Sequence, residues 1–241
     1  MPLPGYDETL DRFGLGKLKS RVDLHFTKSG DIAITRDGDF QMEDTQFNAL
    51  FRFVEGWRRI QSTFNYLFSP MLRASLQLEE LSKTRAQDMG PSLIMNPKDY
   101  HAVTDSILEC QSVSSVLSGA ILVVFDSLLQ RLKKDLNASD GEWELSGTKI
   151  NNHSIGVIFA AATANFRHYD EWACAKKPKS QQLPSMEVLC EVLSLPVLTA
   201  HGFPTIRTNV CGDVLMRISH GSVDILHQIT FGYAKALSKY P

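Results

Sequence analysis

The stretch from Ser154 to Lys176 constrains this chain more than any other, because it opens as an apolar helix and ends among ionisable side chains. At 3.6 residues per turn, one face of this helix carries small and apolar residues first, then an amide and an imidazole. The members of that face are Ile158, Ala161, Ala162, Asn165, His168, Trp172 and Ala175. Buried amides and imidazoles need hydrogen-bonding partners, so we expect either a functional site or a polar packing network here.

Four ionisable residues crowd the end of the same helix, namely Arg167, His168, Asp170 and Glu171. Side chains three or four positions apart on a helix are neighbours. The spacing places Arg167 within reach of Asp170 and Glu171. It also places His168 one turn before Glu171. We therefore expect interactions within the helix itself.

The run Asn165-Phe166-Arg167-His168-Tyr169-Asp170-Glu171-Trp172 resembles a motif of uncharacterised bacterial helical proteins, in which an alanine-rich helix leads into the same residue types. Its surroundings resemble the HEPN superfamily, helical domains of toxin–antitoxin and anti-phage systems, many of which are metal-independent ribonucleases. The resemblance covers the helix order of residues 97–240, and as a motif only these eight residues.

This resemblance implies that the protein binds or cleaves RNA without a metal or cofactor. Arg167 would hold the scissile phosphate, and His168 would move a proton from the ribose 2′-hydroxyl. Asn165 and Glu171 would orient the pair. The resemblance also implies a bacterial or prophage-encoded defence protein that acts as a homodimer in the cytoplasm, with a protein partner from the same operon.

A second interpretation of the same residues is structural. The HEPN nuclease signature separates its arginine from its histidine by several residues, whereas Arg167 and His168 are adjacent and point about 100° apart on a helix. In this interpretation Asn165 and His168 form a buried polar network, and Arg167 pairs with Asp170 or Glu171. The sequence leaves both interpretations open.

Apolar residues alternate with polar ones between Arg21 and Met42, which is typical of strands. The alternating residues are Val22, Leu24, Phe26, Ile32, Ile34, Phe40 and Met42. Turn signals separate them at Lys28–Asp31 and at Arg36–Asp39, and the Asp37-Gly38 pair makes the second the stronger signal. The pattern predicts a small antiparallel β-meander of two or three strands, and we find no internal repeat.

The rest of the chain has helical periodicity. Helices are expected at about residues 45–59, 62–68, 70–84, 97–110, 114–134, 154–176, 186–193, 209–219 and 222–239, with a short hairpin around Trp143 and Leu145. The predicted fold is therefore mainly α, a helical bundle with an N-terminal meander. The connector at residues 87–96 predicts two domains, 1–86 and 97–241, unless the first packs on the second as one continuous domain.

Composition narrows the class of protein. The 241 residues are 43% apolar, enough for a sizeable core, and the formal charge of −2 excludes a strongly basic protein that coats nucleic acid. The four cysteines form no CxxC pair, which favours reduced thiols. The first residues lack the apolar core of a secretory signal, and the longest apolar run, Ala120–Phe125, is too short to cross a bilayer. We therefore expect a soluble, cytoplasmic protein without a membrane partner.

Other candidate sites have ordinary explanations. The acidic group Asp37, Asp39, Glu43 and Asp44 lacks the spacing of a calcium loop, and the histidines lack metal-ligand spacing, so no metal is expected. A basic, aromatic groove for nucleic acid is a weaker alternative to a solvated helix end. Its members would be Trp57, Arg58, Arg59, Phe64, Tyr66 and Arg73.

The N-terminal region supplies a function of a different class. Residues 22–67, with their SGDI and DGD turns, resemble small phage baseplate and tail components. That resemblance implies a non-catalytic interaction module, which would be an antitoxin-like or sensor partner or a phage structural subunit.

Overall fold

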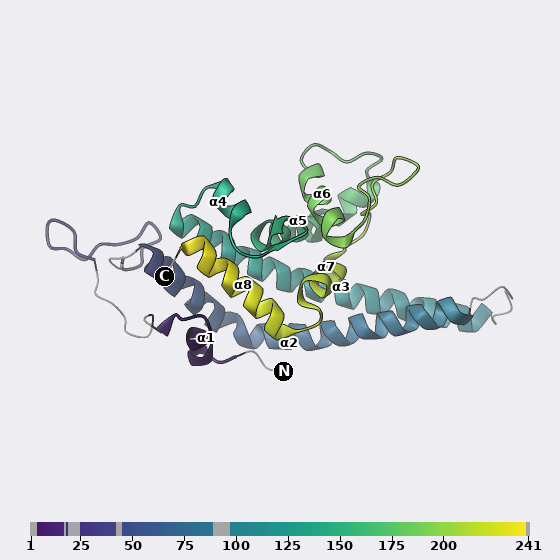
Figure 1. Ribbon diagram of the computed structural model, residues 1–241. Helices are drawn as coiled ribbons and strands as arrows, with labels where there is room; N and C mark the ends of the chain where they lie inside the picture. The colour runs from purple at the N-terminus through teal and green to yellow at the C-terminus, as the bar shows by residue number, and fades with distance from the viewer. Residues whose placement is uncertain (1–3, 17, 19–24, 42–44, 89–96, 240–241) are drawn as a thin grey trace. The chain divides into compact units, whose positions relative to one another are not determined.

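The structure is a computed structural model that describes residues 4–16, 18, 25–41, 45–88 and 97–239 (Figure 1). The described residues form eight helices, and 70% of the chain is helical, which confirms the predicted mainly α fold. The helices are α1 (Tyr6–Arg12), α2 (Thr45–Asp88), α3 (Pro97–Leu136), α4 (Asp140–Leu145), α5 (Ile155–Cys174), α6 (Leu183–Leu193), α7 (Cys211–Ser219) and α8 (Val223–Ser238).

Two compact units make up the chain, and each is built from segments that alternate along the sequence. Unit 1 contains Met1–Ser62, Phe125–Val157 and Val223–Pro241, and unit 2 contains Thr63–Val124 and Ile158–Ser222. The helices α2 and α3 each give one part to each unit. The predicted division into 1–86 and 97–241 stays a prediction, because residues 89–96 lie outside the described part.

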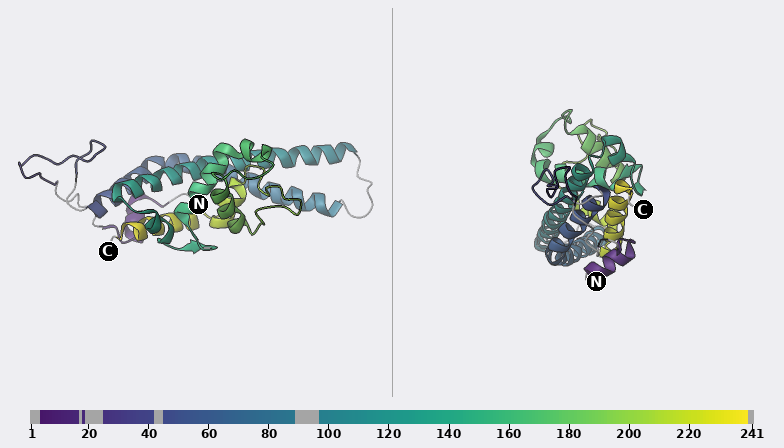
Figure 2. Two further views of the ribbon diagram at one scale, coloured as in Figure 1. Left: turned by 90° about the horizontal axis from the view of Figure 1, so that it is seen from above. Right: turned by 90° about the vertical axis from the view of Figure 1, so that its left-hand side faces the viewer.

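Aromatic side chains fill the core of unit 1, where the first part of α2 runs antiparallel to the last part of α3 (Figure 2). Trp57 of α2 stacks on Phe125 of α3 with ring centroids 5.4 Å apart. From α8, Phe231 meets Trp57 edge-on at 5.3 Å and Phe53 at 5.1 Å. All four rings are buried, so they join α2, α3 and α8 into one core.

Close contacts between helices hold unit 2 together. The hydroxyls of Ser75 on α2 and Ser114 on α3 are 2.6 Å apart. Gly119 of α3 faces the ring of Phe166 on α5 so closely that a Cβ would overlap the ring. A Cβ on Gly212 of α7 would likewise lie 2.8 Å from the Ser114 hydroxyl. Glycine at these two positions therefore lets α5 and α7 lie against α3.

The long helices are longer than the sequence predicts. Helix α2 continues through Pro70, where a new helix is expected, and α3 continues through residues 111–113, where a break is expected. Proline removes one hydrogen bond from a helix interior. Buried side chains on both sides of Pro70, Phe64, Phe68, Met71 and Ala74, compensate for that loss by keeping the same face of α2 in the core.

The predicted N-terminal strands are wrong for the described residues, although both predicted turns form. Between residues 25 and 41 the chain makes only isolated antiparallel bridges, Phe26 with Ile32 and Ile34 with Phe40. The turns follow one another so closely that no ladder has room to extend. Residues 21–24 and Met42 lie outside the described residues. We call residues 25–41 the double-turn segment.

A ring of three backbone hydrogen bonds closes the double-turn segment. The amide of His25 donates to the carbonyl of Gln41, that of Gln41 to Ala33, and that of Ala33 to His25, with lengths of 2.8 Å each. The three residues are eight positions apart in sequence. Such a closed ring fixes both turns relative to each other without a β-ladder.

The same turn occurs a third time, in unit 2, so the chain does contain a short recurring element. In each copy a threonine hydroxyl accepts the amide of the residue four positions later at 3.2 Å: Asp31 on Thr27, Asp39 on Thr35 and Phe203 on Thr199. The fourth residue is a glycine with positive φ, 86°, 86° and 77° at Gly30, Gly38 and Gly202. The three turns share one sequence pattern, an apolar residue followed by Thr-x-x-Gly.

The strands of the described residues lie in mid-chain. They are β1 (Lys149–Ile150) and β2 (His153–Ser154), which pair antiparallel across Asn151 and Asn152, both with positive φ. Two such residues form the tight turn that a hairpin needs. The predicted hairpin around Trp143 and Leu145 is therefore displaced, because those residues belong to α4.

Helix α3 is the one described helix that is long and apolar enough to cross a membrane, over His101–Leu136. In its most apolar stretch 44% of the residues are buried within the protein. Length and composition are shared by membrane helices and by core helices of soluble proteins. The apolar stretch is longer than the run Ala120–Phe125, because no charged residue interrupts α3 between Cys110 and Phe125.

Candidate functional site

The ionisable end of α5 lies on the surface. Arg167, His168, Asp170 and Glu171 are all exposed. His168 Nδ1 is 3.1 Å from Glu171 Oε1, as their spacing predicts. Because a carboxylate only accepts hydrogen bonds, the proton of this contact sits on Nδ1. The Nε2 atom of a neutral His168 is therefore the one that can accept a proton.

Asn165, the fourth predicted site residue, is fully buried and has a different role. Its side-chain oxygen accepts the backbone amide of Val210 at 2.9 Å, and its side-chain amide donates to the carbonyl of Thr208 at 3.2 Å. Val210 immediately precedes α7, so Asn165 ties α5 to the start of that helix. Its two functional groups are thereby occupied within the core.

The structural interpretation of the cluster is correct only for Asn165. His168 is exposed, so it forms no buried network with Asn165. Among the described residues no ion pair joins Arg167 to Asp170 or Glu171. The contact that sequence reasoning missed at this end of α5 is Arg207, which donates twice to the Ala173 carbonyl, at 2.6 and 3.1 Å. An arginine there satisfies a carbonyl at a helix C-terminus.

We expect Asn165→Ala to lower the free energy of unfolding by about 1–3 kcal/mol, because it leaves the buried amide of Val210 without an acceptor. The measurement is urea unfolding at neutral pH. Arg167→Ala, which removes only an exposed side chain, is the control and should change stability by less than about 0.5 kcal/mol. Equal losses in the two variants would contradict the role assigned to Asn165.

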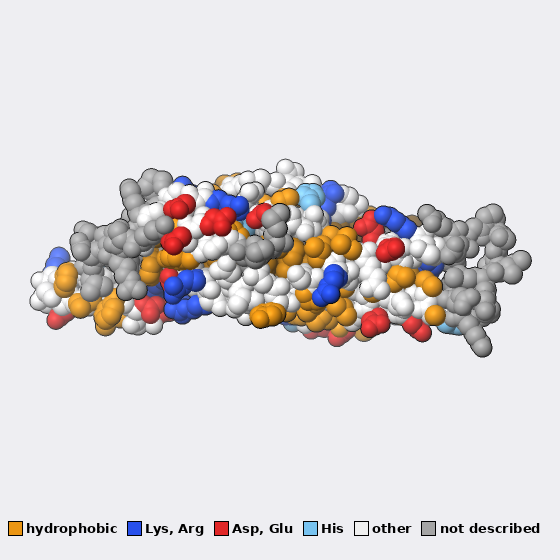
Figure 3. All heavy atoms as spheres, turned by 90° about the horizontal axis from the view of Figure 1, so that it is seen from below, with side chains coloured by type: hydrophobic (Ala, Val, Ile, Leu, Met, Phe, Trp, Pro, Cys, Tyr) orange, Lys and Arg blue, Asp and Glu red, His pale blue; other side chains and the backbone are white. Residues whose placement is uncertain are grey.

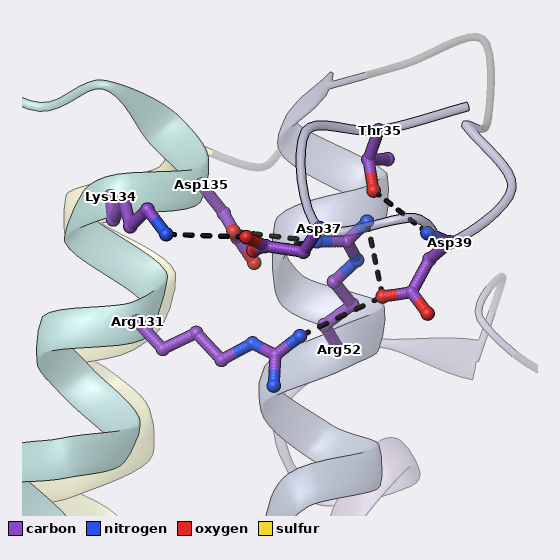
Figure 4. A network of polar contacts seen from close by, with 7 residues as sticks. All are labelled: Thr35, Asp37, Asp39, Arg52, Arg131, Lys134 and Asp135. Carbon is purple, nitrogen blue, oxygen red and sulfur yellow. Dashed lines mark hydrogen bonds and ion pairs between the residues drawn. The ribbon is translucent and has the colours of Figure 1, made fainter. Parts of the chain in front are cut away.

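The acidic residues of the double-turn segment, considered above as a cation site, bind protein cations instead (Figure 4). Asp37 lies 3.3 Å from Lys134 and 3.9 Å from Arg52. Asp39 lies 3.4 Å from Arg52 and 3.6 Å from Arg131. Contact with Lys134 lowers the pKa of Asp37. Glu43 and Asp44 lie outside the described residues.

Arg52 lies at the centre of this network. It projects from α2 and also contacts Asp135 of α3, with Nη1 3.4 Å from Oδ1. The side chains of Arg52 and Asp135 are only 11% and 10% exposed. Sequence reasoning did not single out either residue, although an arginine between Phe51 and Phe53 on an apolar helix was a usable signal.

A pocket of about 250 Å³ opens beside the network in unit 1. It is lined by Ile34, Thr35, Arg36, Asp37, Gln41, Thr45, Asn48, Ala49, Arg52, Lys134 and Asp135. Two buried atoms there, Arg52 Nη2 and Asp135 Oδ2, make no hydrogen bond in the described part of the chain. The residues of this pocket combine a cavity with two buried hydrogen-bonding atoms that lack partners among the described residues, which the surface cluster of α5 does not.

The remaining sequence candidates do not form sites. Two aromatic members of the predicted groove, Trp57 and Phe64, are buried and cannot stack on a base, and Arg58 pairs with Glu55 at 3.2 Å. Within the described ranges no three His, Cys, Asp or Glu side chains are grouped to hold a metal ion. Three of the four cysteines are buried, and Cys174 is exposed.

Comparison of the chain with protein-family models, with curated protein sequences and with solved structures gives no match.

Proposed function

We propose that this protein is a non-catalytic interaction module that assembles with a second copy of itself through the double-turn segment. One observation carries the proposal. Four large apolar side chains of this segment are exposed to solvent, Phe26 by 57%, Ile32 by 39%, Ile34 by 62% and Phe40 by 61%. Hydrophobic side chains (orange) are visible among charged ones on this segment, at the left of Figure 3.

The segment presents these side chains on a fixed frame. The ring of backbone hydrogen bonds through His25, Ala33 and Gln41 holds its two turns together. The ion pairs of Asp37 and Asp39 attach it to α2 and α3. A surface that is ordered before binding loses less conformational entropy on association. Exposed apolar groups on an ordered frame are typical of protein–protein contacts.

Charges of both signs on the segment favour a second copy as the partner. Lys28 and Arg36 are exposed and make no ion pair with any described residue, and Asp31 is an exposed carboxylate. In a two-fold dimer each surface meets its own copy, so a self-complementary patch needs both signs. The apolar side chains would supply the buried centre of the contact, and these charges its rim.

The test is sedimentation velocity over a wide range of protein concentration. We expect wild type to dimerise and the double variant Ile34→Ser, Phe40→Ser to dissociate at least about tenfold more readily, because two apolar anchors are lost. Tyr66→Ser, at a position 81% exposed outside the segment, is the matched control and should dimerise like wild type. A monomeric wild type, or a double variant that dimerises unchanged, would refute the proposal.

A second function, RNA binding and cleavage in a HEPN-like manner in the cytoplasm of a bacterium, is supported by the pair His168 and Glu171. Glu171 holds Nδ1 of His168, which leaves Nε2 on the surface for proton transfer, and Arg167 is exposed beside it. A histidine can move the proton of the ribose 2′-hydroxyl, and an arginine can stabilise the charge of the phosphate, so these residue types suit metal-independent RNA cleavage. Asn165 takes no part, because its side chain is occupied in the core.

We expect a ribonuclease of this kind to cut transfer RNA in metal-free buffer and to lose at least about a hundredfold in rate in either Arg167→Ala or His168→Ala. Arg217→Ala, at another exposed arginine, is the control and should keep wild-type activity. If wild type cuts nothing, or if the control loses activity equally, RNA cleavage by Arg167 and His168 is excluded.

A further inference from the structure

The pocket beside Arg52 has features of a ligand site that self-assembly does not explain. Asp135 Oδ2 is a buried acceptor without a donor, and Arg52 Nη2 is a buried donor without a hydrogen-bond acceptor, although Asp39 lies within ion-pair distance of it. Both residues line the cavity. Buried polar atoms without partners are costly, and folded proteins retain few of them. Here a donor and an acceptor of this kind belong to two residues that line one cavity, which indicates that a bound group completes their hydrogen bonds.

The chemistry of these two atoms limits the ligand. Asp135 Oδ2 requires an N–H or O–H donor, and Arg52 Nη2 requires an acceptor, for which a carboxylate forms the strongest hydrogen bonds. Since both atoms belong to one contacting pair of side chains, the donor and the acceptor of the ligand have to be near neighbours. A carboxylic acid with an amino or hydroxyl group on the adjacent carbon has this arrangement.

The charge of the pocket favours an anionic acceptor. Its lining carries three cations, Arg36, Arg52 and Lys134, against two carboxylates, Asp37 and Asp135. Arg36 makes no ion pair within the described residues. The first turn of α2, at Thr45 and Asn48, also lines the cavity, and a helix N-terminus carries a partial positive charge. Asp39 and Arg131, which contact each other outside the lining, add no net charge, so the carboxylate of a ligand meets an excess of one positive charge.

The side chains around the charges supply neutral hydrogen-bonding groups. The hydroxyls of Thr35 and Thr45 and the side-chain amides of Gln41 and Asn48 line the cavity. The volume of about 250 Å³ lies below the usual range for small-molecule pockets, about 300–1,000 Å³, so the ligand has to be small.

We propose that the pocket between the double-turn segment, α2 and α3 binds a small 2-amino or 2-hydroxy carboxylic acid. The carboxylate is held by Arg52 Nη2 and by Arg36, and the amino or hydroxyl group donates to Asp135 Oδ2. The polar side chains of Thr45 and Asn48 complete the hydrogen bonds of the carboxylate. This site does not rest on the proposed self-association, because it needs only one copy of unit 1.

The test is titration of the full-length ¹⁵N-labelled protein with four related small probes, followed by the NMR signals of the Arg52 side chain and of residues 34–37. L-alanine and L-lactate carry both groups, whereas propionate lacks the donor and ethylamine lacks the carboxylate. We expect the first two to bind, and each truncated probe to bind at least about tenfold more weakly.

Two variants assign the roles. Arg36→Ala removes an exposed cation, so the variant should stay folded. It should bind L-alanine and L-lactate at least about fivefold more weakly than wild type does. Asp135→Asn keeps the shape of the side chain and should abolish the preference for L-lactate over propionate. Arg59→Ala, at an exposed arginine of α2 away from the cavity lining, is the control and should bind like wild type.

Either of two results would overturn the inference. In the first, L-alanine and L-lactate shift none of the pocket signals in a folded wild-type protein. In the second, propionate binds as tightly as L-lactate, which would mean that Asp135 Oδ2 receives no donor from the ligand. A loss of dimerisation in sedimentation would leave this inference unaffected, so the two proposals fail separately.

Discussion

Replacing Arg52 with alanine is expected to lower the free energy of unfolding by about 3–5 kcal/mol at neutral pH, because a buried carboxylate loses its cation. Asp135 is only 10% exposed, and its contact with Arg52 Nη1 at 3.4 Å is the one ion pair that it makes in the described part of the chain. The same substitution releases the double-turn segment, since Asp37 and Asp39 also contact Arg52. Guanidinium unfolding followed by circular dichroism measures the loss.

A second substitution separates the charge from the packing. In the double variant Arg52→Ala, Asp135→Asn the carboxylate is neutral, so we expect at least half of the lost stability to return. Arg131→Ala is the matched control. Its guanidinium lies 3.6 Å from Asp39 but is 54% exposed, and such a pair contributes about 0–1 kcal/mol. If Arg131→Ala costs as much as Arg52→Ala, burial is not what makes Arg52 important.

The helices could be predicted from sequence, because the periodicity of apolar residues reports directly which face is buried. Phe47, Leu50, Val54 and Trp57 repeat at helical spacing, and all four are buried in unit 1. The ends of the helices were harder to predict. Pro70 is a strong local stop signal, but the local preference is overridden by packing on both sides of it.

In the double-turn segment, local sequence signals predict the turns but not which side chains are buried. Gly30 and Gly38 correctly mark two turns, because their positive φ is a property of the turn itself. The alternating apolar residues were expected to form strands with a buried face. Instead Phe26, Ile34 and Phe40 are exposed, because each arm is too short to form a ladder that could cover them. The direction in which a side chain points depends on partners that periodicity does not specify.

In the candidate sites too, contacts within one helix could be predicted from sequence, whereas contacts between distant segments could not. The contact of His168 with Glu171 follows from their spacing on one helix. That Asn165 is buried and His168 exposed depends on α7, which lies more than forty positions later in sequence. The pocket of unit 1 was not predicted at all, because Arg52 meets partners from residues 37, 39 and 135 only after folding.

Acidification is expected to destabilise the protein through His227, a buried histidine of α8. The side chain is fully buried in the aromatic core of unit 1, 4.5 Å from the ring of Phe231 and 5.1 Å from that of Trp57. Its Nε2 lies 3.4 Å from the hydroxyl of Thr9. Its Nδ1 has no hydrogen-bond partner within the described residues. A proton added to this ring would place a charge in an apolar environment.

Burial is the main cause that lowers the pKa of His227 to about 4 from its usual 6.5. The positive charge of Arg12 lowers it further, and the carboxylate of Asp224 opposes this. Because the unfolded chain binds the proton more tightly than the folded one, stability is complete above about pH 6.5. It falls as the pH drops towards 4, and below that the contribution of His227 no longer changes. The total loss is about 3 kcal/mol.

The measurement is urea unfolding at a series of pH values from 7 to 4, compared with His227→Leu. Leucine removes the titrating group and keeps an apolar side chain in the core, so the free energy of unfolding of this variant should fall less steeply between pH 6.5 and 4 than that of wild type. His201→Leu, at an exposed histidine, should retain the wild-type slope. The slope of the free energy of unfolding between pH 6.5 and 4 is the quantity to compare, rather than the stability at pH 7. The introduced leucine can alter packing at every pH, whereas only the loss of the titrating group removes the slope. If His227→Leu and wild type lose stability in parallel, protonation of His227 is not the cause of the acid destabilisation.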